Sequence, residues 1–207
     1  ASSVSSRFPI SSVPALAAAD AVRRMADRLR ARGPDAAGEW TGEGIVLGHR
    51  RLAILDLTSR GRMPMGEARG RLWVAHNGEI YNHGELRREL ASGAAPFCST
   101  SDTEVILHGY ARWGDEVVTR LRGMFAFAVW DQHERRLSLC RDRLGIKPCY
   151  WMRQGGQFLF ASEIGALLQS SGQRHALNPE AVRNLLDYGY VASPHTISQA
   201  VSQLEPG

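Results

Sequence analysis

The middle of the chain carries a series of short apolar segments joined by polar turns, and this series constrains the fold more than any other feature. Residues 124–130 alternate around Phe125, Phe127 and Val129, a pattern typical of a β-strand. Other runs with strand character lie at 45–47, 52–55, 72–77, 137–140, 149–152 and 157–160. Parallel strands need a long crossover, usually a helix. Because strands and helices do not alternate strictly, the sequence predicts an α+β fold with antiparallel sheets.

Helical patterns lie before and after most of these strands. Apolar spacings of three and four predict helices at 16–30, 85–90, 101–110 and near Leu185. The Ser-Asp-Thr-Glu run at 101–104 has the form of a capping box. Asn178 and Pro179 suit the N-cap and first position of the last helix. A Gly-Gly pair at 155–156 predicts a β-hairpin.

Composition and charge exclude several classes of protein. The 207 residues are 43% hydrophobic and 22% charged, which suits a globular domain. The net charge of +4 comes mostly from arginines spread along the chain, so a solvated surface explains it and no nucleic-acid partner is expected. No apolar run approaches the roughly 18 residues of a membrane span, and no signal peptide is recognisable. We expect a cytoplasmic domain without membrane contacts.

The cysteines do not indicate a metal site. Cys98, Cys140 and Cys149 form an odd set without a CxxC motif or metal-finger spacing. That pattern fits a reducing compartment, and each thiol is expected to act as a small buried hydrophobe.

The ends of the chain differ from its middle. Residues 1–14 are rich in Ser and Pro, and are expected to be flexible or left over from an expression vector. Residues 15–190 are expected to form the domain. Residues 191–207 end in a loop-like Glu-Pro-Gly and are expected to begin a linker to a further domain.

Three positions could carry chemistry, although each has a plain structural interpretation. Asn77, Gly78 and Glu79 follow an apolar run and offer an amide, a bare N–H and a carboxylate; Asn-Gly is also a common hairpin dipeptide. Arg51 could grip a carboxylate in a bidentate pair, or be a surface arginine at a strand end. Asp102 could bind an ammonium group, or stabilise a helix N-terminus. Together they would suit an α-amino acid with a carbonyl on its side chain.

Six blocks in the same order give the chain a family resemblance. They lie at 32–35 (RGPD), 48–56 (GHRRLAILD), 77–82 (NGEIYN), 101–104 (SDTE), 123–128 (GMFAFA) and 141–148 (RDRLGIKP). From about residue 20 to 207 the chain resembles the class II glutamine amidotransferases, and is most similar to the glutaminase domain of asparagine synthetase B-like proteins. Each block alone is weakly specific, whereas six collinear blocks are very specific.

The resemblance implies an N-terminal-nucleophile hydrolase fold, a four-layer sandwich with two antiparallel sheets between helical layers. It implies that Arg51 holds the α-carboxylate of glutamine and that Glu79 and Asp102 hold its α-amino group. The Asn77 side chain and the Gly78 N–H would form the oxyanion hole. The residues that the resemblance assigns to glutamine are Arg51, Leu52, Ile54, Leu55, Asn77, Gly78, Glu79 and Asp102.

The nucleophile of such a domain would be an N-terminal cysteine whose own α-amine acts as base. Ala1 stands near the expected place of this cysteine, and serines occupy most of the apolar positions of the family's first strand, so that strand is not expected. Three explanations stay open: a missing or replaced N-terminal segment, a deliberate change to alanine, or a natural domain that does not hydrolyse glutamine. Ser2 or Ser3 would need cleavage to free its amine before it could substitute.

The implied function is hydrolysis of glutamine to glutamate and ammonia, which a second domain would use with ATP and Mg to amidate a carboxylate. No cofactor is expected in the glutaminase-type domain itself, and a homodimer is compatible with the family. The alternative is a glutaminase-like scaffold without activity, as in β-lactam synthetase-like or lasso-peptide cyclase-like proteins. The acceptor carboxylate is not defined by this sequence.

Overall fold

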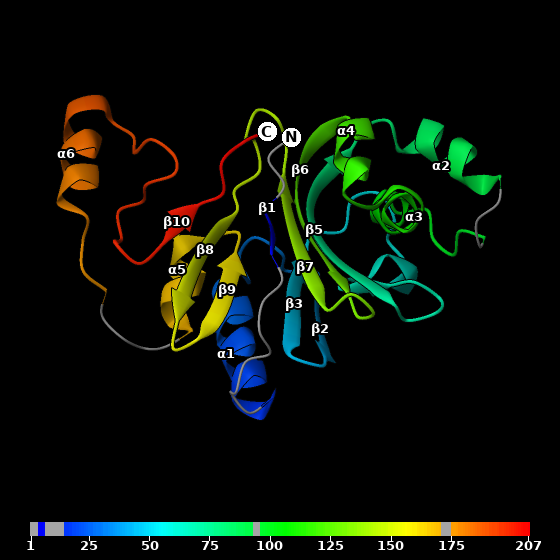
Figure 1. Cartoon of the computed structure of the whole chain (residues 1–207), viewed down its shortest axis with the longest axis horizontal. Coiled ribbons are helices and arrows are strands. Elements are labelled where there is room, and N and C mark those ends of the chain that lie inside the picture. The colour runs from blue at the N-terminus through cyan, green and yellow to red at the C-terminus, as the bar shows by residue number, and fades with distance from the viewer. Residues whose placement is uncertain (1–3, 7–14, 93–95, 171–174) are drawn as a thin grey trace.

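The computed structural model describes residues 4–6, 15–92, 96–170 and 175–207, with residues 4–6 described by their backbone alone (Figure 1). Its largest sheet has five antiparallel strands in the order β1-β7-β6-β5-β4. In that order the strands are Val4–Ser6, Arg136–Arg141, Gly123–Asp131, Leu72–Ile80 and Met65–Gly66. The expected antiparallel α+β architecture is confirmed.

A second layer of strands faces this sheet and consists of two smaller sheets. One is the hairpin of β2 (Ala36–Gly42) and β3 (Ile45–Arg51), and the other has the order β10-β8-β9. These last strands are Ser202–Gln203, Tyr150–Gln154 and Gln157–Ala161. Gly155 and Gly156 join β8 to β9 with φ values of 55° and 76°, so the predicted hairpin is confirmed with the positive φ pair of a type I′ turn.

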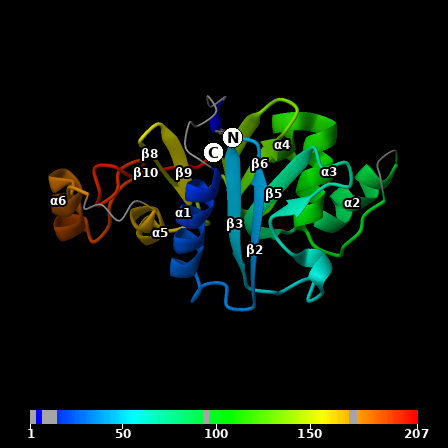
Figure 2. The same cartoon turned by 90° about the horizontal axis from the view of Figure 1, so that it is seen from below.

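Helices cover both outer faces and complete four layers (Figures 1 and 2). On one side α1 (Ala15–Arg28) packs on β3 and on α5 (Ile164–Gln169), which in turn packs on β8 and β9. On the other side α3 (Thr103–Trp113) packs on β5, beside α2 (His83–Ala91). The remaining helical elements are η1 (Ser59–Gly61), η2 (Gly114–Glu116), α4 (Val117–Arg120) and α6 (Pro179–Tyr188). None of the described helices is long and apolar enough to cross a membrane.

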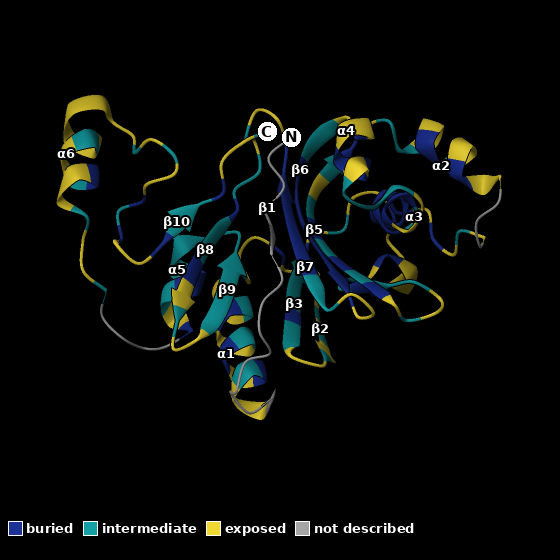
Figure 3. Ribbon diagram, viewed as in Figure 1, coloured by how far each residue is buried: buried dark blue, intermediate teal, exposed yellow. Residues whose placement is uncertain are grey.

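The core lies on both faces of β6, which Figure 3 shows buried along most of its length. Phe125, Phe127 and Val129 pack toward the helices α2 to α4 in one apolar cluster. Ala126 and Ala128 face the second strand layer in another cluster. Small side chains on that face allow the two layers to approach closely.

Two predictions about strands are wrong. Residues 52–55 form no strand, because Leu52 and Ile54 are exposed and the Ala53 N–H donates to the Asp35 carboxylate at 2.8 Å. Conversely, the first strand was not expected because serines occupy most of its apolar positions. It is present as β1, whose Val4 pairs with Leu139. An edge strand needs backbone partners from one neighbour only, so polar composition does not prevent its pairing. Strand β2 was not predicted at all.

The capping predicted from the sequence is confirmed at one helix and wrong at another. Asn178 caps α6 by accepting from two backbone N–H groups, with Pro179 at the first position, as predicted. The prediction of a capping box at 101–104 is wrong. The Glu104 carboxylate accepts from the backbone N–H groups of Cys98 and Ser99 instead of from that of residue 101.

The C-terminal segment packs on the domain within the described structure. Val201 and Leu204 are buried, and β10 pairs with β8. Much of the segment expected to begin a linker therefore lies against the second strand layer.

Gly123 gives a test of the close contact between β5 and β6. Its φ is 154°, and a Cβ there would lie 2.1 Å from the Glu79 carbonyl oxygen. We expect Gly123→Ala to lower the free energy of unfolding by about 2–4 kcal/mol in urea titrations. Gly84→Ala is the control, since a Cβ at Gly84 meets nothing within 4 Å, and it should cause no loss. Equal stability of the two variants would contradict the packing described.

Candidate functional site

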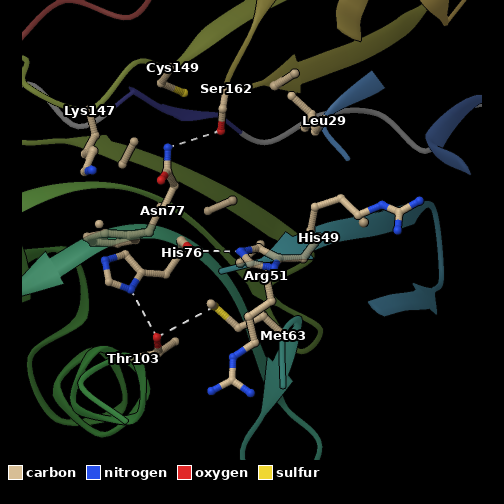
Figure 4. Close-up of a pocket in the computed structure, with 18 of the residues that line it drawn as sticks. Leu29, His49, Arg51, Met63, His76, Asn77, Thr103, Lys147, Cys149 and Ser162 are labelled. Atoms are coloured by element: carbon tan, nitrogen blue, oxygen red, sulfur yellow. Dashed lines mark hydrogen bonds between the residues drawn. The ribbon is translucent and has the colours of Figure 1, made fainter. Parts of the chain in front are cut away.

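A cavity of about 350 Å³ lies between the two strand layers and beneath the loop after β3 (Figure 4). Every described residue that the sequence assigned to glutamine lines it: Arg51, Leu52, Ile54, Leu55, Asn77, Gly78, Glu79 and Asp102. These residues come from β3 and its following loop, from β5 and from the start of α3. Ala1, Ser2 and Ser3 lie outside the described residues.

Asn77 and Gly78 lie within β5, so the plain-turn interpretation of this dipeptide is wrong. The Asn77 side chain projects toward β9 and donates from Nδ2 to Ser162 Oγ at 3.4 Å (Figure 4). Gly78 has a φ of 150°, and a Cβ there would lie 2.1 Å from the Met124 carbonyl oxygen. Glycine is therefore required where β5 crosses the cavity wall.

Arg51 is the last residue of β3 and is buried, so it is not the surface arginine of the plain interpretation. Its guanidinium donates to the Thr58 carbonyl at 3.0 Å and to the Asp56 carbonyl. Figure 4 shows the Arg51 guanidinium and the Asn77 amide pointing toward opposite ends of the site. A cationic group and an amide thus mark its two ends.

Asp56 lies in the loop after β3 and holds that loop in place by hydrogen bonds. Its carboxylate accepts from the Thr58 N–H at 2.9 Å and hydroxyl at 2.6 Å, and from the Thr100 N–H at 3.0 Å and hydroxyl at 3.1 Å. The Thr58 hydroxyl, followed by the backbone N–H donors, lowers the pKa of Asp56 well below its ordinary value. The loop that Arg51 grips is thereby joined to the segment that precedes Asp102.

Asp102 stands at the N-cap position of α3, yet it makes no side-chain cap there. Its Oδ2 accepts instead from the backbone N–H of Ile80 at 2.8 Å, at the end of β5. Asp102 therefore stands at a helix N-terminus, as the plain interpretation expects, but its carboxylate accepts from β5 rather than from the helix. A carboxylate has several acceptor positions, so Oδ1 remains able to take a further donor.

Two histidines at the cavity, of which His76 is buried and His49 partly buried, were not identified from the sequence. His76 Nδ1 lies 3.1 Å from Thr103 Oγ1, and His49 Nε2 lies 2.9 Å from the His76 carbonyl oxygen. Burial lowers the pKa of His76 to about 4 and also lowers that of His49, so both rings are neutral at pH 7. Their positions gave a signal, because His76 directly precedes Asn77 and His49 stands two residues before Arg51.

The block at 141–148 also reaches the cavity, where Lys147 was not predicted. Asp142 organises this loop by accepting from the backbone N–H groups of Phe125, Leu144, Ile146 and Lys147. These donors lower the pKa of the Asp142 carboxyl against the opposing effect of burial. In the described structure this block forms part of the cavity wall.

The cysteines divide into two kinds. Cys140 and Cys149 are buried as predicted, and burial raises the pKa of Cys149 to about 12 and that of Cys140 further. Both therefore remain thiols at pH 7 and are poor nucleophiles. Cys98 is exposed, so its prediction as a buried hydrophobe is wrong. Within the described ranges no three His, Cys, Asp or Glu residues gather as metal ligands would.

Comparison with known proteins assigns the chain to a family. A model described as a glutamine amidotransferase domain matches residues 10–207. Asparagine synthetase (glutamine-hydrolyzing) 3 of Bacillus subtilis is 39% identical over 186 residues, which are 88% of this chain and 30% of that protein. Amidase chry2 of Gibberella zeae is 33% identical, covering 98% of this chain and 30% of that protein.

A solved structure agrees with the family match. Glutamine phosphoribosylpyrophosphate amidotransferase from B. subtilis, complexed with ADP and GMP, aligns with a TM-score of 0.52 at 26% identity, over 60% of this chain and 29% of that one. The chain therefore belongs to the glutamine amidotransferase domains and has their N-terminal-nucleophile hydrolase fold. Within that class it is similar to part of the glutamine-hydrolysing asparagine synthetases. It spans about 30% of the length of the relatives described.

The low pKa of His76 predicts that the stability of the fold depends on pH. The folded-state pKa of His76 is about 4, below the ordinary value of 6.5, so the unfolded chain binds the proton first as the pH falls. Stability should be lost between about pH 6.5 and pH 4, by about 2 kcal/mol at pH 5 relative to pH 7. Urea titrations at both pH values measure this difference.

His76→Phe keeps a ring at this position and removes the titrating group, so the pH-dependent loss should shrink. His133→Gln is the control, because His133 is exposed and its replacement should leave the loss unchanged. An undiminished loss in His76→Phe would show that another group causes it.

Proposed function

We propose that the cavity binds glutamine and that the ammonia released from it serves an ATP-dependent synthetase. The observation that carries this proposal is convergence: eight residues assigned from separate sequence blocks all line one cavity. The family membership of the chain supports the same substrate.

The two ends of the site suit the two ends of glutamine. Arg51 would hold the α-carboxylate through N–H groups that the loop carbonyls leave available, since a guanidinium has five donors. Asp102 Oδ1 and the Glu79 carboxylate would take the α-ammonium group. Asn77 Nδ2 and the Gly78 N–H would hold the side-chain carbonyl oxygen, toward which negative charge moves during attack.

Hydrolysis would need the N-terminal cysteine of the family, with its α-amine accepting the thiol proton. The sulfur would attack the side-chain carbonyl carbon, and the protonated amide nitrogen would leave as ammonia. Water would then cleave the thioester to give glutamate and restore the thiol. β1 supports this arrangement, because Val4 pairs with Leu139, a residue of the cavity wall.

The proposed partner is a synthetase domain that uses ATP and Mg to activate a carboxylate for amidation by this ammonia. Several relatives, among them two of B. subtilis, are named asparagine synthetases, which supports this assignment. No cofactor is proposed for the glutaminase-type domain itself, and a cytoplasmic homodimer is compatible with it. The alternative is a glutaminase-like scaffold that keeps the cavity without hydrolysing glutamine.

Glutamine binding tests the pocket without requiring hydrolysis. We expect L-glutamine to shift the NMR amide signals of the cavity residues saturably and D-glutamine to do so more weakly. Arg51→Ala and Asp102→Asn should each weaken binding by about tenfold to a hundredfold, because each removes a charge-assisted hydrogen bond.

Controls separate lost recognition from lost folding. Arg62 and Glu85 are exposed and lie outside the cavity, so Arg62→Ala and Glu85→Gln should bind as the unmodified chain does. Chemical-shift dispersion confirms that each variant folds. Unchanged affinity in both folded cavity variants would remove the proposed roles of Arg51 and Asp102.

The nucleophile can be tested by restoring it. An Ala1→Cys chain with a free N-terminal amine should release ammonia from glutamine in a coupled dehydrogenase assay, whereas the same chain with one added N-terminal glycine should not. Ala1→Ser is the matched variant and should be slower, since a hydroxyl is the weaker nucleophile. Glutamine binding without ammonia release from Ala1→Cys would favour the scaffold alternative.

A further inference from the structure

Strand β5 has one edge that is only partly covered by another strand. β4 comprises only Met65 and Gly66, which pair with Val74 and Trp73, and the Leu72 carbonyl accepts from Glu67 N–H beside them. In an antiparallel sheet alternate residues direct their N–H and C=O groups to the same edge. The even-numbered residues of β5 therefore face this edge, and those after Val74 extend beyond β4.

Side chains take up the backbone groups that β4 does not reach. His49 donates from Nε2 to the His76 carbonyl at 2.9 Å, and Asp102 accepts from the Ile80 N–H at 2.8 Å. Gly78 lies midway between these two residues, and the alternation directs its N–H to the same edge. The backbone on both sides of the Gly78 N–H is thus held by side chains.

The form of His49 is fixed by its partner. A carbonyl can only accept, so Nε2 carries the proton, and a neutral ring then leaves Nδ1 without one. Nδ1 is buried and meets no hydrogen-bond partner in the part of the chain that the structure describes. Leaving this buried nitrogen without a hydrogen bond costs free energy, so packing alone does not explain the histidine. Its one hydrogen bond, to the His76 carbonyl, is the contact that accounts for it.

We propose that His49 is a positioning residue that, by anchoring the His76 carbonyl, holds the Gly78 N–H in line with the cavity. The inference rests on the proposed glutamine site, because Gly78 acts there as an oxyanion donor. Gly78 has no side chain to restrict its backbone. Its φ is 150°, and glycine can adopt many other φ values as well. Anchors at His76 and Ile80 would restrict the peptide between them to one orientation.

Substitution of His49 tests this arrangement in the unliganded chain. His49→Phe fills a similar volume and removes the donor, while His49→Gln offers an amide N–H near the same place. We expect His49→Phe to shift the Gly78 amide resonance and to speed its hydrogen exchange about tenfold, the value of one hydrogen bond. His49→Gln should restore both, which a merely space-filling role would not predict. His133→Gln, an exposed histidine change, is the control.

Glutamine affinity gives the second measurement. His49→Phe should bind L-glutamine about tenfold more weakly, and His49→Gln within about threefold of the unmodified chain. If the unmodified chain binds no glutamine but His49→Phe still changes the Gly78 amide resonance and its exchange, the proposed function fails and the positioning role stands. If both the Gly78 amide and the affinity are unchanged in folded His49→Phe, the positioning role is overturned. Should His49→Phe not fold, a His49→Gln chain with altered Gly78 exchange would overturn it equally.

Discussion

The pairing of β5 with β6 is the interaction on which the rest of the molecule depends. Nine residue pairs join the two strands, from Leu72 opposite Asp131 to Ile80 opposite Gly123. One face of the pair carries the aromatic and branched side chains on which the helices α2 to α4 pack. The other face carries Ala126, Ala128 and Trp130 against the second strand layer. Both hydrophobic clusters therefore need the same register, because a slip by one residue would exchange the two faces.

The site inherits its geometry from that pairing. Gly78 and Gly123 approach the opposite strand so closely that any Cβ would strike a backbone carbonyl, which brings β6 directly behind the cavity wall. The loop after β3 completes the other wall and is fixed by Asp56 to Thr58 and Thr100. The loop at the charged end is therefore held by hydrogen bonds, and the strand at the amide end is held by its pairing with β6.

The sequence predicted the α+β class, most helices and strands, and a set of residues that the fold brings to one cavity. Local patterns sufficed there because period-2 and period-3.6 spacings report burial directly. They failed at 52–55, where apolar residues line a cavity instead of pairing, and at β1, whose pairing is supplied by β7. The role of His76 in the fold could not be predicted, because its environment comes from Thr103 and His49 across the chain.

The shortness of β4 has a consequence for self-association. A sheet that stops early presents unpaired N–H and C=O groups, which are a template for a strand of another molecule. Here the template is interrupted, because a His49 ring and an Asp102 carboxylate occupy alternate positions along it. An incoming strand would have to displace both, and would meet a buried carboxylate as it did so. The side chains that leave room for a small ligand at this edge therefore also protect the molecule from polymerising through it.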